Sequence, residues 1–498
     1  TTAPTTGASS GGETQTASES AESGKITKTD IVVGQASDIV TLDPAGQQDT
    51  TSGVLMKHAY STLLDVDNEG KVVPDLAESY EMKSDMEYVF KLREDACFWD
   101  GTPVTAQDVK FSLDRAKGMP KTKSNTSKIE EVTVNGDHEV TIKLIEPYAA
   151  FKTIVTQHNL SILSEKAVTE AGDSYGDVDN LLGSGPFKVT EWVPNDHYTL
   201  VRNDNYWGEM PIATSITCRV IPEGSARTIA LEAGEIDVVW SVDPTDCANV
   251  ESNPDVKLLS QPSTGIDYVG MNTQKEKFSD KRVRQAINYA LDKQAFVDTI
   301  IEGRGLVANS YINAAIPGWT DEVEAYPYDP EKAKELLAEA GYPDGFECSI
   351  FVNGDLRTRS AQILQAQLAD VGIKVDISTY EWGALLDTLN AGEHEMFLLG
   401  WSNTSFDPDG STYQLFYSGN HGATGNRAFF SNDKVDELIL SAQRESEESK
   451  RMELYKELQF VLHEESPWCP LYYKENNVGV RADLKGFTLH AGAQHYLG

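Results

Sequence analysis

"VVPDLAESYEMKSDMEYVFKLREDACFWDGTPVTAQDVKFSLDRA", residues 72–116, contains a strand pattern followed by a helix pattern. Hydrophobic and polar residues alternate from Tyr88 to Leu92, which is the period of a half-buried β-strand. A helix is predicted to begin after Thr105, because Thr105 can cap it and Asp108 can return the hydrogen bond. A strand and a helix in one short stretch indicate a mixed α/β fold.

The same patterns divide the chain into a strand-rich part and a helix-rich part. Strands are predicted at Ile31–Val33 and Val140–Leu144, and a strand pair is predicted around the turn Pro194–Asn195. Strands dominate residues 26–200 and helices dominate residues 283–462. The sequence therefore predicts two mixed α/β units, with no short internal repeat.

Two helices in the second part are predicted from their apolar faces and caps. Residues 280–301 are predicted to form one helix whose apolar face extends to Leu291. A second helix, "DPEKAKELLAEAG", has Asp329 as its cap, Pro330 at its first position and Gly341 as its stop.

Size and charge exclude several classes of protein. The chain has 498 residues, too many for one ordinary core, so two or three domains are expected. It has no apolar stretch of the roughly 20 residues that a transmembrane helix needs. The formal net charge of −36 disfavours nucleic-acid binding, which needs patches of Lys and Arg.

The cysteines and the N-terminal residues give two further expectations. The five cysteines are scattered without a CxxC motif, so we expect them to be reduced and mostly buried. Residues 1–25 contain no large hydrophobic side chain, so they are predicted to form a disordered linker. Such a linker is either without function or a spacer from a membrane anchor, which a lipid-modified cysteine upstream of Thr1 would supply.

Sequence motifs for catalysis and for metal binding are missing. There is no GxSxG elbow, no HExxH and no P-loop. The stretches after His394 and His463 lack the second histidine that a zinc site needs. We therefore expect a protein that is not an enzyme and that holds neither a metal nor a cofactor.

Six blocks of the sequence resemble the family 5 extracellular solute-binding proteins of ABC importers, the dipeptide-, oligopeptide- and nickel-binding group. They occur in the family's order and extend the resemblance from about residue 26 to the C-terminus. The blocks are residues 72–116, 183–211, 221–240, 278–305, 326–346 and 379–410.

The resemblance implies a type II periplasmic-binding-protein fold in its large three-domain variant, with two lobes around a ligand cleft. Domain I would consist of residues 26–58, 183–261 and 475–498. Domain II, residues 59–182, would be inserted within it, and domain III would span residues 262–474. The ligand would be enclosed between domains I and III by hinge closure.

The stretch "GWSNTSFDPDG", residues 400–410, follows a predicted strand and resembles a ligand-binding turn of the dipeptide-binding relatives. Trp401 and the stretch Asp407–Asp409 match that pattern and Asn403 lies within it, but Thr404 replaces the aspartate that holds a peptide ammonium in those relatives. A buried ammonium needs a carboxylate partner. Either Asp49 or Asp407 takes this role, or the ligand has no amine there; as turn residues, both aspartates could instead be purely structural.

Other candidate binding residues come from the same resemblance. Arg357 and Arg359 lie before a predicted helix, where an arginine could grip a peptide carboxylate with two hydrogen bonds; the alternative is a solvent-exposed arginine. Trp382, with Trp401, matches aromatic residues that flank the ligand, although both could be core residues. Trp240 and Gln48 are weaker candidates, at a strand end and in the first loop.

The sequence leaves three functions open. The first is the receptor of an ABC importer that captures a peptide or peptide-like solute and delivers it to a membrane permease with ATPase subunits. The second is the same receptor for an oligosaccharide, an opine-like compound or a chelated metal, which Thr404 favours. The third and weakest is a hydrolase. As a receptor, the protein is expected to be a monomer at the extracellular face of a bacterial membrane, lipid-anchored, or in the periplasm.

Overall fold

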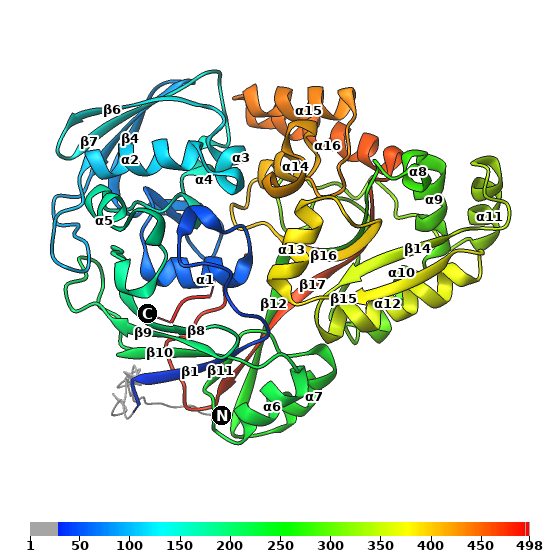
Figure 1. Cartoon of the computed structure of the whole chain (residues 1–498), viewed down its shortest axis with the longest axis horizontal. Helices are drawn as coiled ribbons and strands as arrows, with labels where there is room; N and C mark the ends of the chain where they lie inside the picture. Colours follow the sequence, from blue (N-terminus) through cyan, green and yellow to red (C-terminus); the bar gives the residue numbers. More distant parts are fainter. Residues whose placement is uncertain (1–27, 494, 498) are drawn as a thin grey trace, which may run out of the picture.

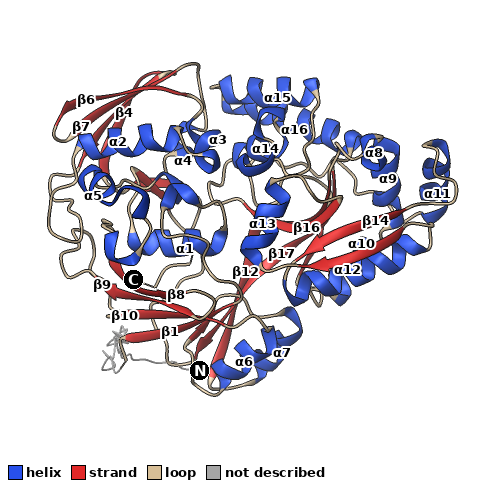
Figure 2. Cartoon of the chain, viewed as in Figure 1, coloured by secondary structure: helices blue, strands red, loops and turns tan. Residues whose placement is uncertain are grey.

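The computed structural model describes residues 28–493 and 495–497. It contains two lobes that share one large mixed sheet (Figure 1). The linker predicted for residues 1–25 lies outside the described residues. Helices lie against the faces of the sheet, as the α/β pattern of the sequence predicts (Figure 2).

The large sheet contains eleven strands. Its central pair, β12 and β17, separates strands of the first lobe from strands of the second. From one edge to the other the order is β15 (Lys374–Thr379), β14 (Glu347–Val352), β16 (Met396–Ser402), β12 (Val256–Met271), β17 (Trp468–Arg481), β11 (Val238–Val239), β1 (Asp30–Gln35), β10 (Ser215–Val220), β9 (His197–Arg202) and β8 (Phe187–Val193), and β13 (Gly305–Val307) pairs with β17.

The first lobe also holds a four-stranded antiparallel sheet with its own hydrophobic core. The predicted strands of residues 88–92 and 140–144 are neighbours in it, and the predicted capping box of Thr105 and Asp108 begins α2. Its strands are β4 (Ala77–Ser84), β5 (Glu87–Leu92), β7 (Glu139–Leu144) and β6 (Ile129–Gly136), and β2 (Leu64–Val66) pairs with β3 (Val72–Pro74) nearby. The helices of this lobe are α1 (Thr50–Ala59), α2 (Ala106–Lys117), α3 (Lys123–Thr126), α4 (Phe151–Ile154), α5 (Glu165–Ala171), α6 (Gly224–Glu232) and α7 (Cys247–Ser252).

In the second lobe two hydrophobic cores cover opposite faces of the sheet. One core packs α9, α10, α11 and α12 against β14 and β15, and the other packs α13 to α16 against β16. The helices of this lobe are α8 (Glu276–Ser279), α9 (Lys281–Ala290), α10 (Lys293–Thr299), α11 (Pro330–Glu339), α12 (Gly354–Ala369), α13 (Trp382–Asn390), α14 (Asp409–Phe416), α15 (Asp433–Arg444) and α16 (Glu448–Glu465).

Strands β12 and β17 run through both lobes. They pair from Val256 to Pro262 and again from Ile266 to Gly270, with a register shift between the two segments. We call residues 28–261 and 475–497 the first lobe and residues 262–474 the second lobe. The predicted domain boundaries at 261/262 and 474/475 fall beside this register shift, and the division into three domains stays a prediction.

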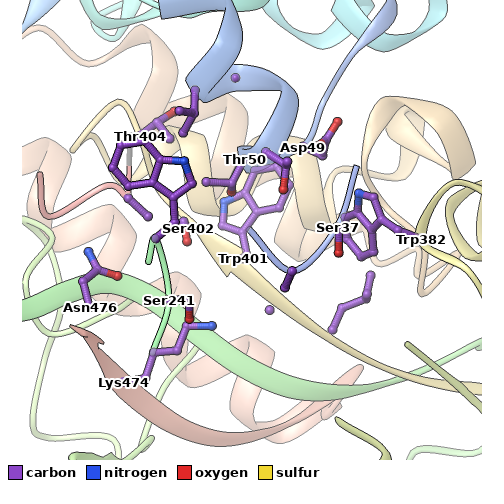
Figure 3. A pocket seen from close by; sticks show the side chains of 18 of the residues that line it. Ser37, Asp49, Thr50, Ser241, Trp382, Trp401, Ser402, Thr404, Lys474 and Asn476 are labelled. Atoms are coloured by element: carbon purple, nitrogen blue, oxygen red, sulfur yellow. The ribbon is translucent and has the colours of Figure 1, made fainter. Parts of the chain in front are cut away.

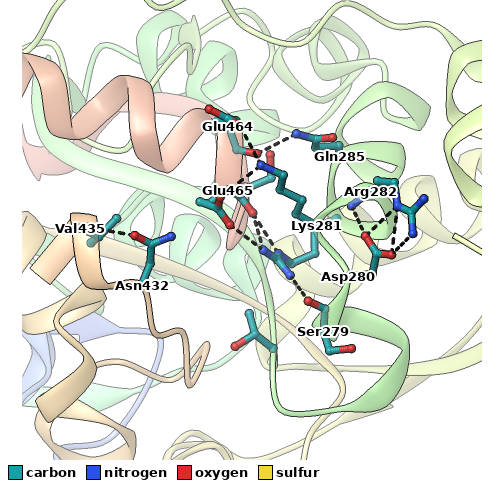
Figure 4. A network of polar contacts seen from close by, with 12 residues as sticks. Ser279, Asp280, Lys281, Arg282, Gln285, Asn432, Val435, Glu464 and Glu465 are labelled. Atoms are coloured by element: carbon teal, nitrogen blue, oxygen red, sulfur yellow. Dashed lines mark hydrogen bonds and ion pairs between the residues drawn. The ribbon is translucent and has the colours of Figure 1, made fainter.

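The prediction of a single helix over residues 280–301 is wrong, because the chain forms two helices there. The structure has two helices, α9 and α10, because Leu291 leaves the helical conformation and Asp292 caps α10 through Ala295 N. The start of α9 is held against the end of α16, where Lys281 donates to Glu464 at 2.7 Å (Figure 4). Arg284 also donates to the carbonyl of Glu465 at 2.6 Å. Asn432 caps the adjacent α15 in the same view.

The predictions about the cap of α11 and about the cysteines are confirmed. Asp329 caps α11 by accepting from Lys332 N, and Pro330 is its first residue. All five cysteines are free, and all but Cys97 are buried. Among the described residues, no helix combines the length and hydropathy needed to cross a bilayer.

Candidate functional site

A cavity of about 360 Å³ lies between the two lobes. One side of the cavity is formed by residues after β1 and at the start of α1, including Asp49 and Thr50. Ser241, Lys474 and Asn476 lie on the other side (Figure 3). The end of β16 and the start of α12 complete the wall. This volume is within the range of small-molecule sites in proteins.

Most of the residues that the sequence singled out line this cavity. They come from both lobes, although they are separated by hundreds of positions in the chain. The lining residues among them are Gln48, Asp49, Trp240, Arg357, Trp382, Trp401 and Thr404, whereas Arg359, Asn403 and Asp407 lie outside the lining.

The turn after β16 forms part of the cavity wall. Trp401 donates its indole N–H to the carbonyl of Gly410 at 3.0 Å, so the ring is fixed at the strand end. Asn403 is buried and donates to the carbonyl of Asp407 at 2.7 Å, which holds the turn together. Thr404 donates its hydroxyl to Gln157 of the first lobe at 2.8 Å. Asn403 therefore shapes the turn, and Thr404 joins the two lobes.

Asp407, one of the two aspartates that the sequence offers for a ligand amine, is engaged in an ion pair within the second lobe. Both of its carboxylate oxygens accept from the guanidinium of Arg451, one of them at 2.9 Å, and both side chains are buried. Asp409, two residues later, accepts from Tyr148 at 2.6 Å and from Gln443 at 2.9 Å. The ion pair and the position of Asp407 outside the cavity lining favour the structural alternative for this residue.

The two neighbouring arginines differ in their environment. Arg359 pairs with Asp243 of the first lobe at 2.8 Å, outside the cavity, so it connects the lobes. Arg357 lines the cavity, donates to Asn353 at 2.7 Å, and lies with its guanidinium carbon 5.9 Å from the ring centre of Trp382. Of the two, Arg357 is the one that lines the cavity.

Asp49 presents an unpaired carboxylate oxygen. Its Oδ1 accepts from Ser52 N at 2.9 Å and so caps α1, while its buried Oδ2 has no hydrogen-bond partner among the described residues. Burial is the main cause that raises the pKa of this carboxyl group, against hydrogen bonds that lower it. A buried polar atom without a partner costs free energy unless a ligand or water satisfies it.

Sequence reasoning missed many polar side chains of the cavity, among them Tyr268, Arg427 and Lys474. Lys474 lies 2.8 Å from Asp267 Oδ2, and Arg357 lies 3.9 Å from Asp267 Oδ1, so two cations share one buried carboxylate. No local pattern in the sequence marks these residues. They reach the cavity only because β12, β17 and the loop after α14 converge there.

Aromatic side chains supply apolar surface on both lobes. Trp240 stacks on His495 with ring centres 5.4 Å apart, and Trp382 belongs to the second lobe. The indole N–H groups of both tryptophans are buried without a partner among the described residues. Apolar walls with a few polar groups are typical of a site for a small organic solute.

The described residues offer no group of three or more His, Cys, Asp or Glu side chains that could hold a metal ion. The cavity instead holds cationic, anionic and aromatic side chains, an arrangement suited to binding a charged organic molecule.

The model of the family described as bacterial extracellular solute-binding proteins, family 5 (middle), matches residues 71–423. The chain belongs to this family. Glutathione-binding protein GsiB of Escherichia coli (strain K12) is 32% identical over 479 residues, which cover 92% of both chains. The family and these relatives are binding proteins of transporters, in agreement with the resemblance read from the sequence.

Solved structures of related solute-binding proteins have the same fold. The periplasmic binding protein DppA from Helicobacter pylori, in complex with the peptide STSA, is 29% identical with a TM-score of 0.89, and the match covers 94% of this chain and 98% of DppA. AgaA from A. tumefaciens R10, in complex with agropinic acid, is 27% identical with a TM-score of 0.88, over 93% and 97% of the two chains. The type II periplasmic-binding fold is thus confirmed, and the family places the protein outside the cytoplasm of a bacterium.

Proposed function

We propose that the protein binds a peptide or peptide-like solute between its two lobes and delivers it to the permease of an ABC importer, without chemical change. The observation that carries this proposal is the cavity between the lobes, with the unpaired Asp49 on one lobe and Arg357 on the other. Relatives over nearly the whole chain bind glutathione or a peptide, according to their names.

The charges of the cavity support a solute with both a carboxylate and an ammonium group. Arg357 and Lys474 share the single carboxylate of Asp267, which leaves positive charge for a ligand carboxylate. Asp49 Oδ2 can accept from a ligand ammonium group that takes the place of its missing partner. Asp49 thus takes the role of the aspartate that dipeptide-binding relatives have at the position of Thr404.

Direct contacts between the lobes support hinge closure as the mechanism. Thr404 bonds to Gln157, Arg359 pairs with Asp243, and Gln48 donates to the carbonyl of Thr424 at 3.2 Å, each across the two lobes. A solute that contacts both lobes gains its full interactions only in the closed form, so it shifts the population toward that form. The closed form would then dock on the permease.

Calorimetry with di-, tri- and pentapeptides and a matched set of oligosaccharides tests the proposal. We expect the peptides to bind and the oligosaccharides not to bind. The Asp49→Asn variant keeps a capping side chain for α1 but loses the negative charge, so it should bind peptides with a free amine at least about 10-fold more weakly. Binding of sugars alone, or peptide affinity unaffected in the variant, would contradict the assignment.

An opine-like solute is the second candidate. AgaA, which has the same fold, was solved with agropinic acid, and Thr404 brings no charge to the position where dipeptide-binding relatives keep an acid. Including an opine in the same calorimetry distinguishes the two, because an opine that outcompetes every peptide would select this alternative.

We also propose that a lipid anchor upstream of Thr1 attaches the protein to the membrane and that it acts as a monomer. The composition of residues 1–25, rich in Thr, Ser, Gly and Glu, supports a spacer. Mass spectrometry of the native protein should find a lipid-modified N-terminus, and an unmodified one would overturn the anchor.

A further inference from the structure

Arg427 is a buried cation without a carboxylate partner. Only 7% of its surface is exposed, and no carboxylate of the described residues lies within 4.0 Å of it. Its Nε donates to Asn390 at 3.0 Å, but neither terminal nitrogen donates to a described residue. Arg427 lines the cavity, so these terminal nitrogens are available to a solute there.

Other buried arginines of the chain show what a purely structural guanidinium looks like. Arg284 donates from both terminal nitrogens to carbonyls, including that of Phe278 at 2.8 Å. Arg227 likewise donates from both to carbonyls, including that of Ile221 at 2.7 Å. Neither lines the cavity. Arg427 differs from them because it lines the cavity while its terminal nitrogens donate to no described residue, and a buried charge without a partner is costly.

Asp49 belongs to the same region of the cavity as Arg427. The neighbouring Gln48 donates to the carbonyl of Thr424, in the loop that leads to Arg427, at 3.2 Å. Burial lowers the pKa of the Arg427 guanidinium, and Tyr268 and Asp49 act against that change. Asp49 and Arg427 thus line the same cavity, the first with an unpaired carboxylate oxygen and the second with two terminal nitrogens that donate to no described residue.

We propose, building on the function above, that Asp49 and Arg427 together bind an α-amino-acid head group that carries a free ammonium and a free α-carboxylate. Asp49 would accept from the ammonium and Arg427 would donate to the carboxylate. The first residue of an ordinary peptide has no free α-carboxylate, because its peptide bond uses that group. The favoured solute class is therefore a peptide linked through the side chain of its first residue, such as a γ-glutamyl peptide.

The isomers γ-Glu-Ala-Gly and α-Glu-Ala-Gly test this proposal, because they have the same composition and the same charged groups. Only the γ isomer has the ammonium and a carboxylate on one carbon. We expect calorimetry to show at least about 10-fold tighter binding of the γ isomer. Arg427→Gln should remove this preference, mainly by weakening the γ isomer, while Asp49→Asn should weaken both isomers.

Asn390→Ala is the matched control, since it removes the structural hydrogen bond of Arg427 and keeps the charge. It should retain the preference for the γ isomer, and thermal unfolding should confirm that all variants are folded. Equal binding of the two isomers by the wild-type protein, or an equal loss of both in Arg427→Gln, overturns this inference and leaves the proposed function standing. Failure to bind these isomers and every other peptide overturns the proposed function, and the inference with it.

Discussion

Two aspartates in the turn after β16 have different interaction partners. Asp407 is paired with Arg451, and Asp409 is bonded to Tyr148 and Gln443. Neither lines the cavity, so neither faces the space proposed for the solute. From this turn, Trp401 and Thr404 line the cavity, whereas the two aspartates form contacts within the protein.

Removing the partner of Asp407 should destabilise the protein strongly. We expect Arg451→Met to lower the free energy of unfolding by about 3–5 kcal/mol, because it leaves a buried carboxylate without a counter-ion. Lys450→Met is the matched control on the same helix, since Lys450 is exposed and, among the residues that the structure describes, forms its ion pair with Glu447 at the surface. Denaturant unfolding measures both variants, and an equal small effect would show that the pair is not needed.

Asp409 should make stability depend on pH. Burial and the nearby charge of Asp407 raise its pKa to about 6, above the value of 3.8 in an unfolded chain. The folded protein therefore binds this proton more tightly, so the stabilising effect is complete below about pH 4 and is lost as the pH rises through 6. Asp409→Asn cannot titrate, so the stability of the wild type relative to this variant should fall by about 3 kcal/mol over that range. A constant difference from pH 4 to pH 7 would refute the assignment.

At the scale of elements, the caps were the most predictable features. The sequence of α11 gives its cap, its first proline and its stop, and Asp329 does accept from Lys332 N at 2.9 Å. Asp329→Ala should lower the free energy of unfolding by about 1 kcal/mol, whereas Asp329→Asn should have little effect because asparagine caps equally well. Unfolding monitored by circular dichroism can resolve this difference, and equal losses in the two variants would argue against capping.

Local signals explain what the sequence could and could not predict about the elements. Strand alternation and caps depend on residues within one or two turns, so β5, α2 and α11 were predicted correctly. The continuous helix over residues 280–301 was wrong because a favourable apolar face outweighed the cap signal of Asp292, which begins α10. Hydrophobic periodicity alone does not show such a break.

The site was only partly predictable because its contacts are not local. Trp382, Trp401 and Arg357 came from a family resemblance and do line the cavity. The role of Asp407 depends on Arg451, 44 positions later, and Arg427 follows an irregular loop with no pattern of its own. Only the folded chain shows which charges are already paired.

At the scale of the whole molecule, the contacts between the lobes should control affinity. Tyr148 of the first lobe donates to Asp409 of the second at 2.6 Å, and this bond must break when the lobes separate. We expect Tyr148→Phe to weaken solute binding roughly 10-fold by disfavouring the closed form, since a hydrogen bond to a charged group contributes about 1.5–3 kcal/mol. Calorimetry measures the affinity, and X-ray scattering should show a larger radius of gyration.

Tyr88→Phe provides the control for this experiment. Tyr88 is buried in the four-stranded sheet of the first lobe, and its hydroxyl has no hydrogen bond to the described residues of the second lobe. Its removal should leave affinity and radius unchanged. If both variants weaken binding equally, the effect comes from general destabilisation rather than from the contact between the lobes.

The paired strands β12 and β17 have a practical consequence. Because they are hydrogen-bonded to each other on both sides of the register shift, they should restrict the lobes to rotation about a single axis near Pro262 and Glu475. The relative position of the two lobes is then described by a single rotation angle. Two fluorescent dyes, one on each lobe and far from the cavity, would then report solute binding through a single distance, which makes the protein a natural scaffold for an optical sensor.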